Sequence, residues 1–552
     1  MRIRFISSLE KCFSDESLNS KPELSSASML KNEVFRFGFC CELKNPCNGG
    51  ETLFLKVNSD INEHVRVYKV EQVPVELATY RFKTDENFLR TSPGLYPDLL
   101  LPVGLDARLN FGNFLQSFVI EVSPECGAVG VCPIDVTFTD KNGTVRASER
   151  FTLEIIDALL PKQELIFTQW FYCDCLKEFY GTEAFDERHW QIIENYMKTA
   201  VSHGVNMLLT PVFTPPLDTY VGGERPTMQL VDVSVEDDGY GFDFSKLGRW
   251  IDLCDRVGIG YFEIPHFFTQ WGAEHAPKIV ARVNGETKRI FGWETDACSE
   301  EYAGFLGSFI PALLNYLKSK NGADRRCRFH VSDEPKTEQL GQYAAARAVV
   351  APLLEGYPIC DALSNYEFYE QGTVTHPVVA IDSIEPFIKA DVPDLWGYYC
   401  CVQTVGVPNR FIDMPSARNR VLGILLYKYK LSGFLHWGYN FYNNALSYNS
   451  VNPYLHTDAG LFVPAGDAFS VYPAPDGTPY TSLRLKVFHD ALQDLRALTL
   501  CERLYGREFV MSLVEKDIPP VTFDRYPTDA AWLTDLRERI NRCVKKASHT
   551  EG

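Results

Sequence analysis

The stretch RCRFHVSDEPKTEQLGQYAAARAVVAPLL, residues 326–354, contains the pattern on which the predicted fold depends. Its first part, residues 326–334, alternates apolar and polar side chains as a strand does, and Pro335 favours an extended backbone before it and ends the run. Residues 337–354 then carry apolar side chains at three- and four-residue spacing, which is typical of an amphipathic helix. A strand followed by a helix is one βα unit, and repeated βα units build a parallel sheet.

The same alternation of strand-like and helical segments continues on both sides of this stretch, after Pro161. Helices are predicted at residues 187–203, 244–257, 300–320, 337–354 and 415–431, with short or irregular connections after the fifth and sixth strands. Eight units in about 280 residues match the size of a TIM barrel. The sequence therefore predicts an α/β fold with a TIM-type (β/α)8 barrel. The eight strand candidates are residues 164–172, 205–213, 259–268, 326–334, 357–365, 378–384, 394–401 and 433–441.

The N-terminal part of the chain has a different pattern, with short strands broken by turn residues and almost no helical periodicity. Evenly spaced short strands of this kind predict an N-terminal β-sandwich, while residues 1–33 are expected to be partly loose. We predict a sandwich domain at 1–158, a catalytic barrel at 159–510 and a C-terminal tail at 511–552 that packs on the barrel. The strand candidates are residues 34–41, 51–57, 65–73, 116–122, 134–138 and 148–156.

The net charge and the length of the apolar runs argue against nucleic acid and membrane partners. The 552-residue chain has 54 Lys and Arg against 72 Asp and Glu, a net charge of −18 that disfavours binding to nucleic acid. Apolar runs are much shorter than the ~20 residues of a membrane helix, and no export signal is recognisable. We therefore expect a cytoplasmic protein with no membrane partner, and a homo-oligomer is left open. The 16 cysteines are expected to be free thiols.

Active sites of TIM barrels lie at the carboxyl ends of the strands. The side chains predicted there are aromatic, acidic, amide or histidine, with few cations, and no Gly-rich phosphate loop is present. Aromatic faces with hydrogen-bonding partners suit a sugar ring, so a small oligosaccharide or glycoside is the expected partner. The candidate substrate-binding residues are Trp170, Asp174, His266, Trp271, His330, Asp361, Tyr398, Tyr399, His436, Trp437 and Tyr439.

Asp333 and Glu334 are the candidate catalytic residues. Adjacent acids in a dry site raise the pKa of one of them, which gives a neutral acid beside an anion, as glycoside cleavage requires. Regular strand alternation would turn Asp333 toward the outer helices, so we expect the strand to break at this point. The alternative is an acidic pair that caps the following helix.

A second carboxylate is needed by a conventional retaining glycosidase. The seventh strand ends in Tyr398, Tyr399, Cys400 and Cys401, without an acid, which favours a substrate whose own acetamido oxygen is the nucleophile. Asp382 and Glu385 keep the conventional two-carboxylate glycosidase open, and a non-catalytic carbohydrate-binding barrel is a third possibility.

One pattern in the third strand has the spacing of a metal site. Glu263 and His266 form E-x-x-H, with His275 nearby, but three-residue spacing on a strand turns the first two side chains to opposite faces. The sequence therefore predicts no metal and no cofactor.

The segment HVSDEP, residues 330–335, is similar to the Asp-Glu signature of glycoside hydrolase family 123 and its relatives. Residues 169–176, 209–219, 222–226, 268–278 and 434–443 also resemble this group, a bacterial family catalogued as domain of unknown function 4091. The similarity spans about residues 165–500. It implies a β-N-acetylhexosaminidase, with N-acetylgalactosamine as the family's known preference.

The resemblance also implies residue roles. Asp333 would hold the N–H of the 2-acetamido group and aim its carbonyl oxygen at the anomeric carbon, and Glu334 would protonate the departing oxygen. Water would open the oxazolinium-type intermediate with Glu334 as base, so an exo-acting enzyme that retains configuration is predicted. Trp437, His436, Tyr398 and Trp271 would line the sugar subsite.

Overall fold

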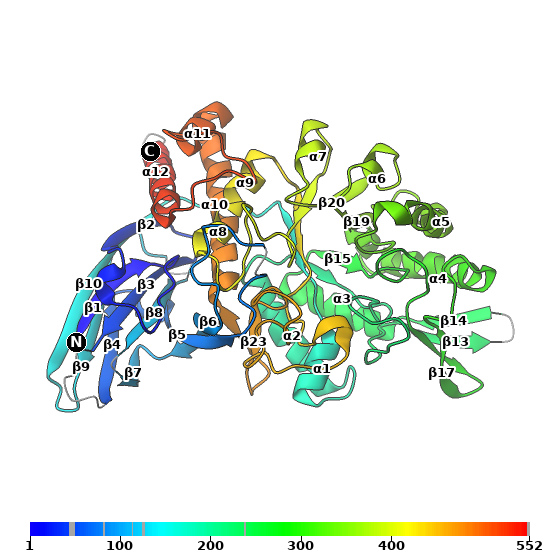
Figure 1. The fold of residues 1–552 in the computed structure, drawn as a ribbon, viewed down its shortest axis with the longest axis horizontal. Helices are drawn as coiled ribbons and strands as arrows, with labels where there is room; N and C mark the ends of the chain where they lie inside the picture. The colour runs from blue at the N-terminus through cyan, green and yellow to red at the C-terminus, as the bar shows by residue number, and fades with distance from the viewer. Residues whose placement is uncertain (44–49, 81–82, 113, 124–126, 237–238, 549–552) are drawn as a thin grey trace.

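The computed structural model describes residues 1–43, 50–80, 83–112, 114–123, 127–236 and 239–548. Two sheets formed mainly by N-terminal residues occupy one end of the molecule, and an eight-stranded parallel sheet with its helices occupies the other (Figure 1). No helix within these described ranges is long and apolar enough to cross a membrane.

The eight-stranded sheet is nearly closed as a barrel. Its strands are neighbours in chain order, every ladder between them is parallel, and the last strand pairs with the first. The fourth and fifth strands are joined only by a parallel bridge between Phe329 and Ile359 within the described residues. The strands are β11 (Ile166–Gln169), β12 (Met207–Leu209), β15 (Tyr261–Ile264), β18 (Cys327–Phe329), β19 (Cys360–Leu363), β20 (His376–Ala380), β21 (Trp396–Tyr398) and β22 (Gly433–His436).

Helices separate these strands, but the outer ring is uneven. The helices after the fifth and sixth strands, α6 (Glu367–Glu370) and α7 (Glu385–Lys389), have only four and five residues. The alternating α/β pattern with eight parallel strands is thus confirmed, whereas the complete (β/α)8 ring of a TIM barrel is shown only in part. The other helices are α1 (Cys173–Tyr180), α2 (Glu187–Val201), α3 (Ser245–Val257), α4 (Glu300–Ser319), α5 (Leu340–Val350), α8 (Ser416–Arg420), α9 (Leu422–Lys428) and α10 (Leu483–Tyr505).

A small four-stranded sheet is inserted in the connections after β12 and β15, in the order β14-β13-β16-β17. It was not predicted from the sequence, although residues 232–236 alternate apolar and polar side chains and Asn284-Gly285 is a hairpin signal between β16 and β17. Its strands are β13 (Asp232–Glu236), β14 (Gly239–Asp243), β16 (Ile279–Val283) and β17 (Glu286–Phe291).

The two N-terminal sheets face each other across one apolar core, in which the rings of Phe37 and Phe151 stack at 3.8 Å. Residues 1–33 are not loose: Ile3, Phe5 and Met29 are buried in this core, so β1 and β2 are full members of the sheets. One sheet has the order β1-β3-β8-β5-β6-β24-β23 and the other β2-β10-β9-β4-β7. Their N-terminal strands are β1 (Arg2–Ser7), β2 (Ser26–Leu30), β3 (Phe35–Glu42), β4 (Glu51–Ser59), β5 (Val65–Val75), β6 (Gly94–Val103), β7 (Asp106–Phe111), β8 (Leu115–Val122), β9 (Gly130–Thr139) and β10 (Val145–Ile156).

Residues from the end of the chain return to the N-terminal sheets. The hairpin of β23 (Val471–Pro473) and β24 (Pro479–Ser482) extends the first sheet, where Thr481 pairs with Leu100 of β6. Helix α11 (Arg507–Val514) packs near α10, and α12 (Ala530–Ser548) lies against β2, where the Glu538 carboxylate accepts hydrogen bonds from the backbone and hydroxyl of Ser28 at 2.7 Å. Hydrogen bonds therefore join parts of the chain that were predicted as separate domains.

Candidate active site

The strand that leads to the acid pair ends before the predicted point at Asp333. Strand β18 ends at Phe329, and residues 330–336 are irregular. Glu334 has a φ of 43°, in the left-handed region that non-glycine residues rarely adopt. Because the alternation of strand side chains is lost here, Asp333 and Glu334 are directed to different partners at the carboxyl edge of the barrel.

Asp333 is hydrogen-bonded to the loop that follows β15. Its Oδ2 accepts from the Gln270 side-chain amide at 2.7 Å, and the Gln270 Oε1 accepts from the backbone N–H of Asp218 at 2.7 Å. Burial, then the nearby Glu334, raise the pKa of the Asp333 carboxyl, which is only 5% exposed. The following helical turn, Thr337–Gln339, has Lys336 as its N-cap residue, and the backbone N–H of Lys336 donates to the Gln339 side chain, so the acid pair does not cap this turn.

Glu334 points to the seventh strand. Its Oε1 accepts a hydrogen bond from the Tyr398 hydroxyl at 2.6 Å. Burial raises the pKa of the Glu334 carboxyl and the neighbouring Asp382 raises it further, while the hydrogen bond from Tyr398 opposes both. A carboxyl group with a raised pKa is suited to donate a proton near neutral pH.

Beneath the acid pair, a charged network fills the barrel interior. The two nitrogens of His330 lie 2.9 Å from a Glu263 oxygen and 3.3 Å from an Asp361 oxygen, and the Trp170 indole donates to Glu263 at 2.7 Å. Burial alone would lower the pKa of His330, but the hydrogen bonds to the two carboxylates raise it to about 10. The side chains of Trp170, His330 and Asp361 are thus hydrogen-bonded within this buried network.

His266 lies against this network, with its ring centroid 4.5 Å from that of His330. Neither of its buried nitrogens has a hydrogen-bond partner. His266, His330 and Asp361 are the group of described residues that brings potential metal-ligand atoms within 4.8 Å of one another. Both His330 nitrogens already contact carboxylates, so charge pairing accounts for His330 and Asp361 but not for the two unpartnered nitrogens of His266.

The eighth strand supplies an indole at the same edge. The backbone N–H of Gly438 donates to Nδ1 of His436 at 2.9 Å, and the other nitrogen of that ring lies 3.2 Å from the Asp467 carboxylate. The half-buried Trp437 donates its indole N–H to Asp467 at 2.8 Å. Burial raises the pKa of Asp467 to about 7, and Arg410 opposes this effect.

The family model described as the catalytic domain of glycoside hydrolase 123 matches residues 170–501. The chain belongs to glycoside hydrolase family 123. A solved structure of a family 123 glycoside hydrolase from Clostridium perfringens, described in connection with glycolipid glycan hydrolysis, superposes on it with a TM-score of 0.72. The two chains share 13% sequence identity over 99% of this chain and 97% of the other, which establishes a common fold.

Other similarities of this family 123 chain are weak. An endo-β-1,4-mannanase from Thermotoga petrophila matches with a TM-score of 0.35 and 13% identity, over 61% of this chain and 78% of the other. A putative β-galactosidase from Bacteroides fragilis matches with a TM-score of 0.31 and 9% identity, over 84% and 58%. A search among curated proteins found no match.

Three predicted substrate-binding residues are held away from the acid pair in this family 123 chain. The Tyr439 hydroxyl donates to the Tyr196 carbonyl at 3.0 Å, and the Tyr399 hydroxyl donates to Asn419 at 3.0 Å, so both side chains point toward helices. Asp174 forms a buried ion pair with Arg225. Tyr399 directly follows β21, whereas Asp174 lies in the first turn of α1 and not at the end of β11, so contacts with helices decide where these side chains go.

Trp271 lies at the rim and is 39% exposed. Its backbone N–H donates to the Asp333 carbonyl at 3.2 Å. Three further residues close to the acids were not predicted, namely Asp218, Gln270 and Asp467. Gln270 precedes a predicted residue and Asp218 lies in a segment that resembles the family, whereas Asp467 follows the barrel strands at a distance that no local pattern marks.

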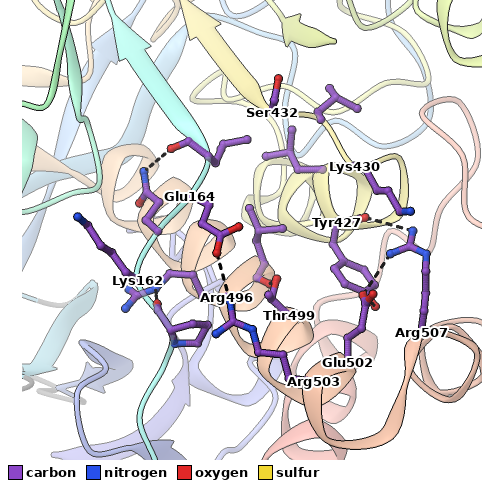
Figure 2. Close-up of a pocket in the computed structure, with 16 residues that line it drawn as sticks. Lys162, Glu164, Tyr427, Lys430, Ser432, Arg496, Thr499, Glu502, Arg503 and Arg507 are labelled. Atoms are coloured by element: carbon purple, nitrogen blue, oxygen red, sulfur yellow. Dashed lines mark hydrogen bonds and ion pairs between the residues drawn. The ribbon is translucent and has the colours of Figure 1, made fainter. Parts of the chain in front are cut away.

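A cavity of about 670 Å³ at the opposite end of the barrel is separate from this site. Figure 2 shows it between α9, α10 and the chain that leads into β11. Arg503 is paired with Glu164 at 3.2 Å and Arg507 with Glu502 at 3.3 Å, so these charges compensate each other. The side chains at the carboxyl edge, not this cavity, form the candidate active site.

Substitution of Asp467 by asparagine is expected to change how stability depends on pH. A carboxyl whose pKa is raised in the folded state loses stabilisation as pH rises from its unfolded value of about 4 toward about 7. The free energy of unfolding of Asp467→Asn relative to wild type should therefore increase between pH 5 and about pH 7, with a slope of at most ~1.4 kcal/mol per pH unit, and the difference in melting temperature should increase with it. Thermal unfolding across this range measures it, with the exposed Asp535→Asn as control; a pH-independent difference would contradict the assignment.

Proposed function

We propose that this family 123 glycoside hydrolase is an exo-acting, retaining β-N-acetylhexosaminidase that prefers N-acetylgalactosamine and uses the 2-acetamido oxygen of its substrate as nucleophile. The observation that carries the proposal is the divergence of two adjacent acids, Asp333 toward Gln270 and Glu334 toward Tyr398. Each acid thus has its own partner, as a division between orientation and proton transfer requires.

In the first step, the Asp333 carboxylate accepts the acetamido N–H and directs the acetamido carbonyl oxygen to the anomeric carbon. Glu334 donates its proton to the glycosidic oxygen as the bond from that oxygen to the anomeric carbon breaks, and an oxazolinium ion forms. In the second step, Glu334 takes a proton from water, which attacks the anomeric carbon from the face that the leaving group vacated. Two inversions retain the configuration.

Gln270 and Tyr398 support this division. The Gln270 amide fixes the direction of the Asp333 carboxylate, and the Tyr398 hydroxyl fixes that of Glu334. The half-buried Trp437 and the exposed Trp271 offer apolar faces for a small oligosaccharide or glycoside.

The conventional two-carboxylate mechanism is the second candidate. Glu385 is poorly placed for it, since its side chain is 76% exposed and pairs with Lys389 on its own helix. Asp382 is better placed, because it is close enough to raise the pKa of Glu334, and Gln403 donates to its carboxylate at 3.0 Å. Asp382 is therefore the acid that a conventional mechanism would use.

A substrate panel separates these mechanisms. We expect the aryl N-acetyl-β-galactosaminide and N-acetyl-β-glucosaminide to be cleaved with kcat/KM values at least ~10²-fold above those of the matching 2-hydroxy galactoside and glucoside, because only the former carry the nucleophile. Comparable rates for both classes would favour Asp382 as nucleophile. Binding of the sugars without any hydrolysis would favour the non-catalytic barrel.

A further inference from the structure

The cavity at the amino-terminal end of the barrel strands has the size and the walls of a ligand site. Its volume of about 670 Å³ is within the range of cavities that bind small molecules. The end of α9, the middle of α10 and the chain segments that lead into β11 and β22 surround it (Figure 2). The buried Leu165, Leu426 and Leu431 provide an apolar wall on which the body of a ligand can pack.

The same cavity has more basic than acidic side chains. Its acidic lining residues are Glu164 and Glu502, which are paired with Arg503 at 3.2 Å and with Arg507 at 3.3 Å. Glu502 is also engaged by the Tyr427 hydroxyl, which donates to it at 2.5 Å. Three basic side chains remain that have no acidic partner among the residues that the structure describes, although the chain as a whole has a net charge of −18. They are Lys162, Lys430 and Arg496.

Arg496 is the fixed member of this group. Its Nε donates to the Pro161 carbonyl at 2.7 Å, which holds the half-buried guanidinium in the cavity wall. In the described part of the chain, the two other nitrogens of this guanidinium have no hydrogen-bond partner. Burial lowers the pKa of Arg496, and Glu33, which opposes this effect, is itself paired with Arg537 at 2.6 Å. Arg496 therefore presents an uncompensated positive charge and free donors.

Lys162 and Lys430 add charge at opposite edges of the cavity, and no dashed line joins either ammonium group to another side chain in Figure 2. Lys430 lies just beyond the end of α9 with a φ of 52°, a conformation in which glycine is the usual residue. The backbone at this position thus does not explain a lysine. Both side chains are exposed and flexible, so their ammonium groups can turn toward an anion in the cavity.

We propose that this cavity is a binding site for a small molecule that carries a phosphate group, with Arg496 as the fixed contact and Lys162 and Lys430 as mobile ones. A guanidinium donates to two phosphate oxygens at once, and an ammonium group interacts with phosphate as a point charge. The leucines would contact the apolar face of the ligand. The site uses side chains and not a Gly-rich loop, and it is independent of the proposed hexosaminidase activity.

Calorimetry on the full chain tests the proposal with glucose 6-phosphate, glucose and glucuronate, which share a sugar ring and differ in charge. We expect glucose 6-phosphate to bind at one site and, at saturating concentration, to raise the melting temperature. Glucose should not bind measurably. Glucuronate should bind with a Kd at least ~10-fold higher, because it has one negative charge fewer to pair with the basic groups.

Three variants locate the binding. Arg496→Gln should raise the Kd for glucose 6-phosphate by at least ~10-fold, as the loss of a charged hydrogen-bonding partner implies. Since this variant also loses the contact with Pro161, a second one changes only exposed groups: Lys162→Gln combined with Lys430→Gln should raise the Kd by roughly 3- to 10-fold. Lys318→Gln, at an exposed lysine of α4, is the matched control and should leave the Kd unchanged.

Absence of glucose 6-phosphate binding to wild type would overturn the inference, and so would an unchanged Kd in both the Arg496 variant and the double lysine variant. Equal Kd values for glucuronate and glucose 6-phosphate would overturn the assignment to phosphate. Hydrolysis of aryl N-acetylhexosaminides is measured separately, and its kcat/KM should be the same in wild type and in the double lysine variant. Failure of either proposal can therefore be recognised without the other.

Discussion

Asp333→Asn is expected to lower kcat/KM for aryl N-acetyl-β-hexosaminides by about 10²–10³-fold. An asparagine retains the size of the side chain but removes the charge that holds the acetamido N–H and stabilises the oxazolinium ion. The Asp333 carboxylate also accepts a hydrogen bond from the Gln270 amide. In the variant, the acetamido N–H and the Gln270 amide would therefore compete for the single side-chain oxygen of the asparagine. Steady-state kinetics on purified protein, with circular dichroism to verify folding, measures the effect.

The pH profile adds a second readout for Asp333. Burial raises its pKa, so the carboxylate that the mechanism needs is lost on the acid side, and kcat/KM should fall there in wild type. The residual activity of Asp333→Asn should lack this part of the profile. The exposed Asp535→Asn should behave as wild type, and an Asp333→Asn enzyme with unchanged kinetics would refute the orienting role.

Glu334→Gln is expected to lower kcat/KM by about 10²–10⁴-fold for substrates with poorly acidic leaving groups, which need a proton from the enzyme. For a dinitrophenyl glycoside the first step needs little protonation, so kcat/KM should fall by less than about tenfold. The second step still lacks its base, and kcat should therefore fall even on that substrate.

Two control variants test whether the loss of activity in Glu334→Gln is specific to the proton donor. Glu385→Gln changes an exposed acid that follows β20, whereas Glu334 follows β18. This variant should leave all rates unchanged. Asp382→Asn should have a moderate effect on the proposed mechanism and a severe one if Asp382 were the nucleophile. Equal losses on good and poor leaving groups in Glu334→Gln would show that Glu334 is not the proton donor.

The barrel strands were predictable because each is a short apolar run that packs in the same core. Seven of the eight candidate segments contain a strand of the parallel sheet, and the sixth, residues 378–384, overlaps β20, which begins earlier, at His376; each strand is shorter than its apolar run. The apolar residues after each strand continue into packed loops, as in Trp170 and Phe171, so apolarity alone could not locate the strand ends. The one-turn helices α6 and α7 correspond to the short connections expected after the fifth and sixth strands.

The surroundings of the acid pair were predictable only for residues that are close to the pair in the sequence as well as in the structure. An irregular backbone at the acid pair was expected from Pro335 and from the need to turn Asp333 away from the helices, but the strand ends earlier than predicted, at Phe329. The partners of the acids come from other loops: Gln270 reaches Asp333 from 63 residues away, and Tyr398 reaches Glu334 from 64 residues away. Tyr439 and Tyr399 were predicted as site residues because the sequence shows that they lie near the ends of strands. The sequence does not show in which direction their side chains point after the strand has ended.

The hairpin of β23 and β24 has a consequence for biosynthesis. Strand β6 ends at Val103, whereas its partner β24 begins at Pro479. At a translation rate of ~5–20 residues per second, roughly 20–75 s separate the emergence of the two strands from the ribosome. During this interval, one edge of β6 has unpaired backbone N–H and C=O groups. Nascent chains aggregate at such edges, so we expect the exposure of this edge to determine how strongly the protein depends on chaperones during expression.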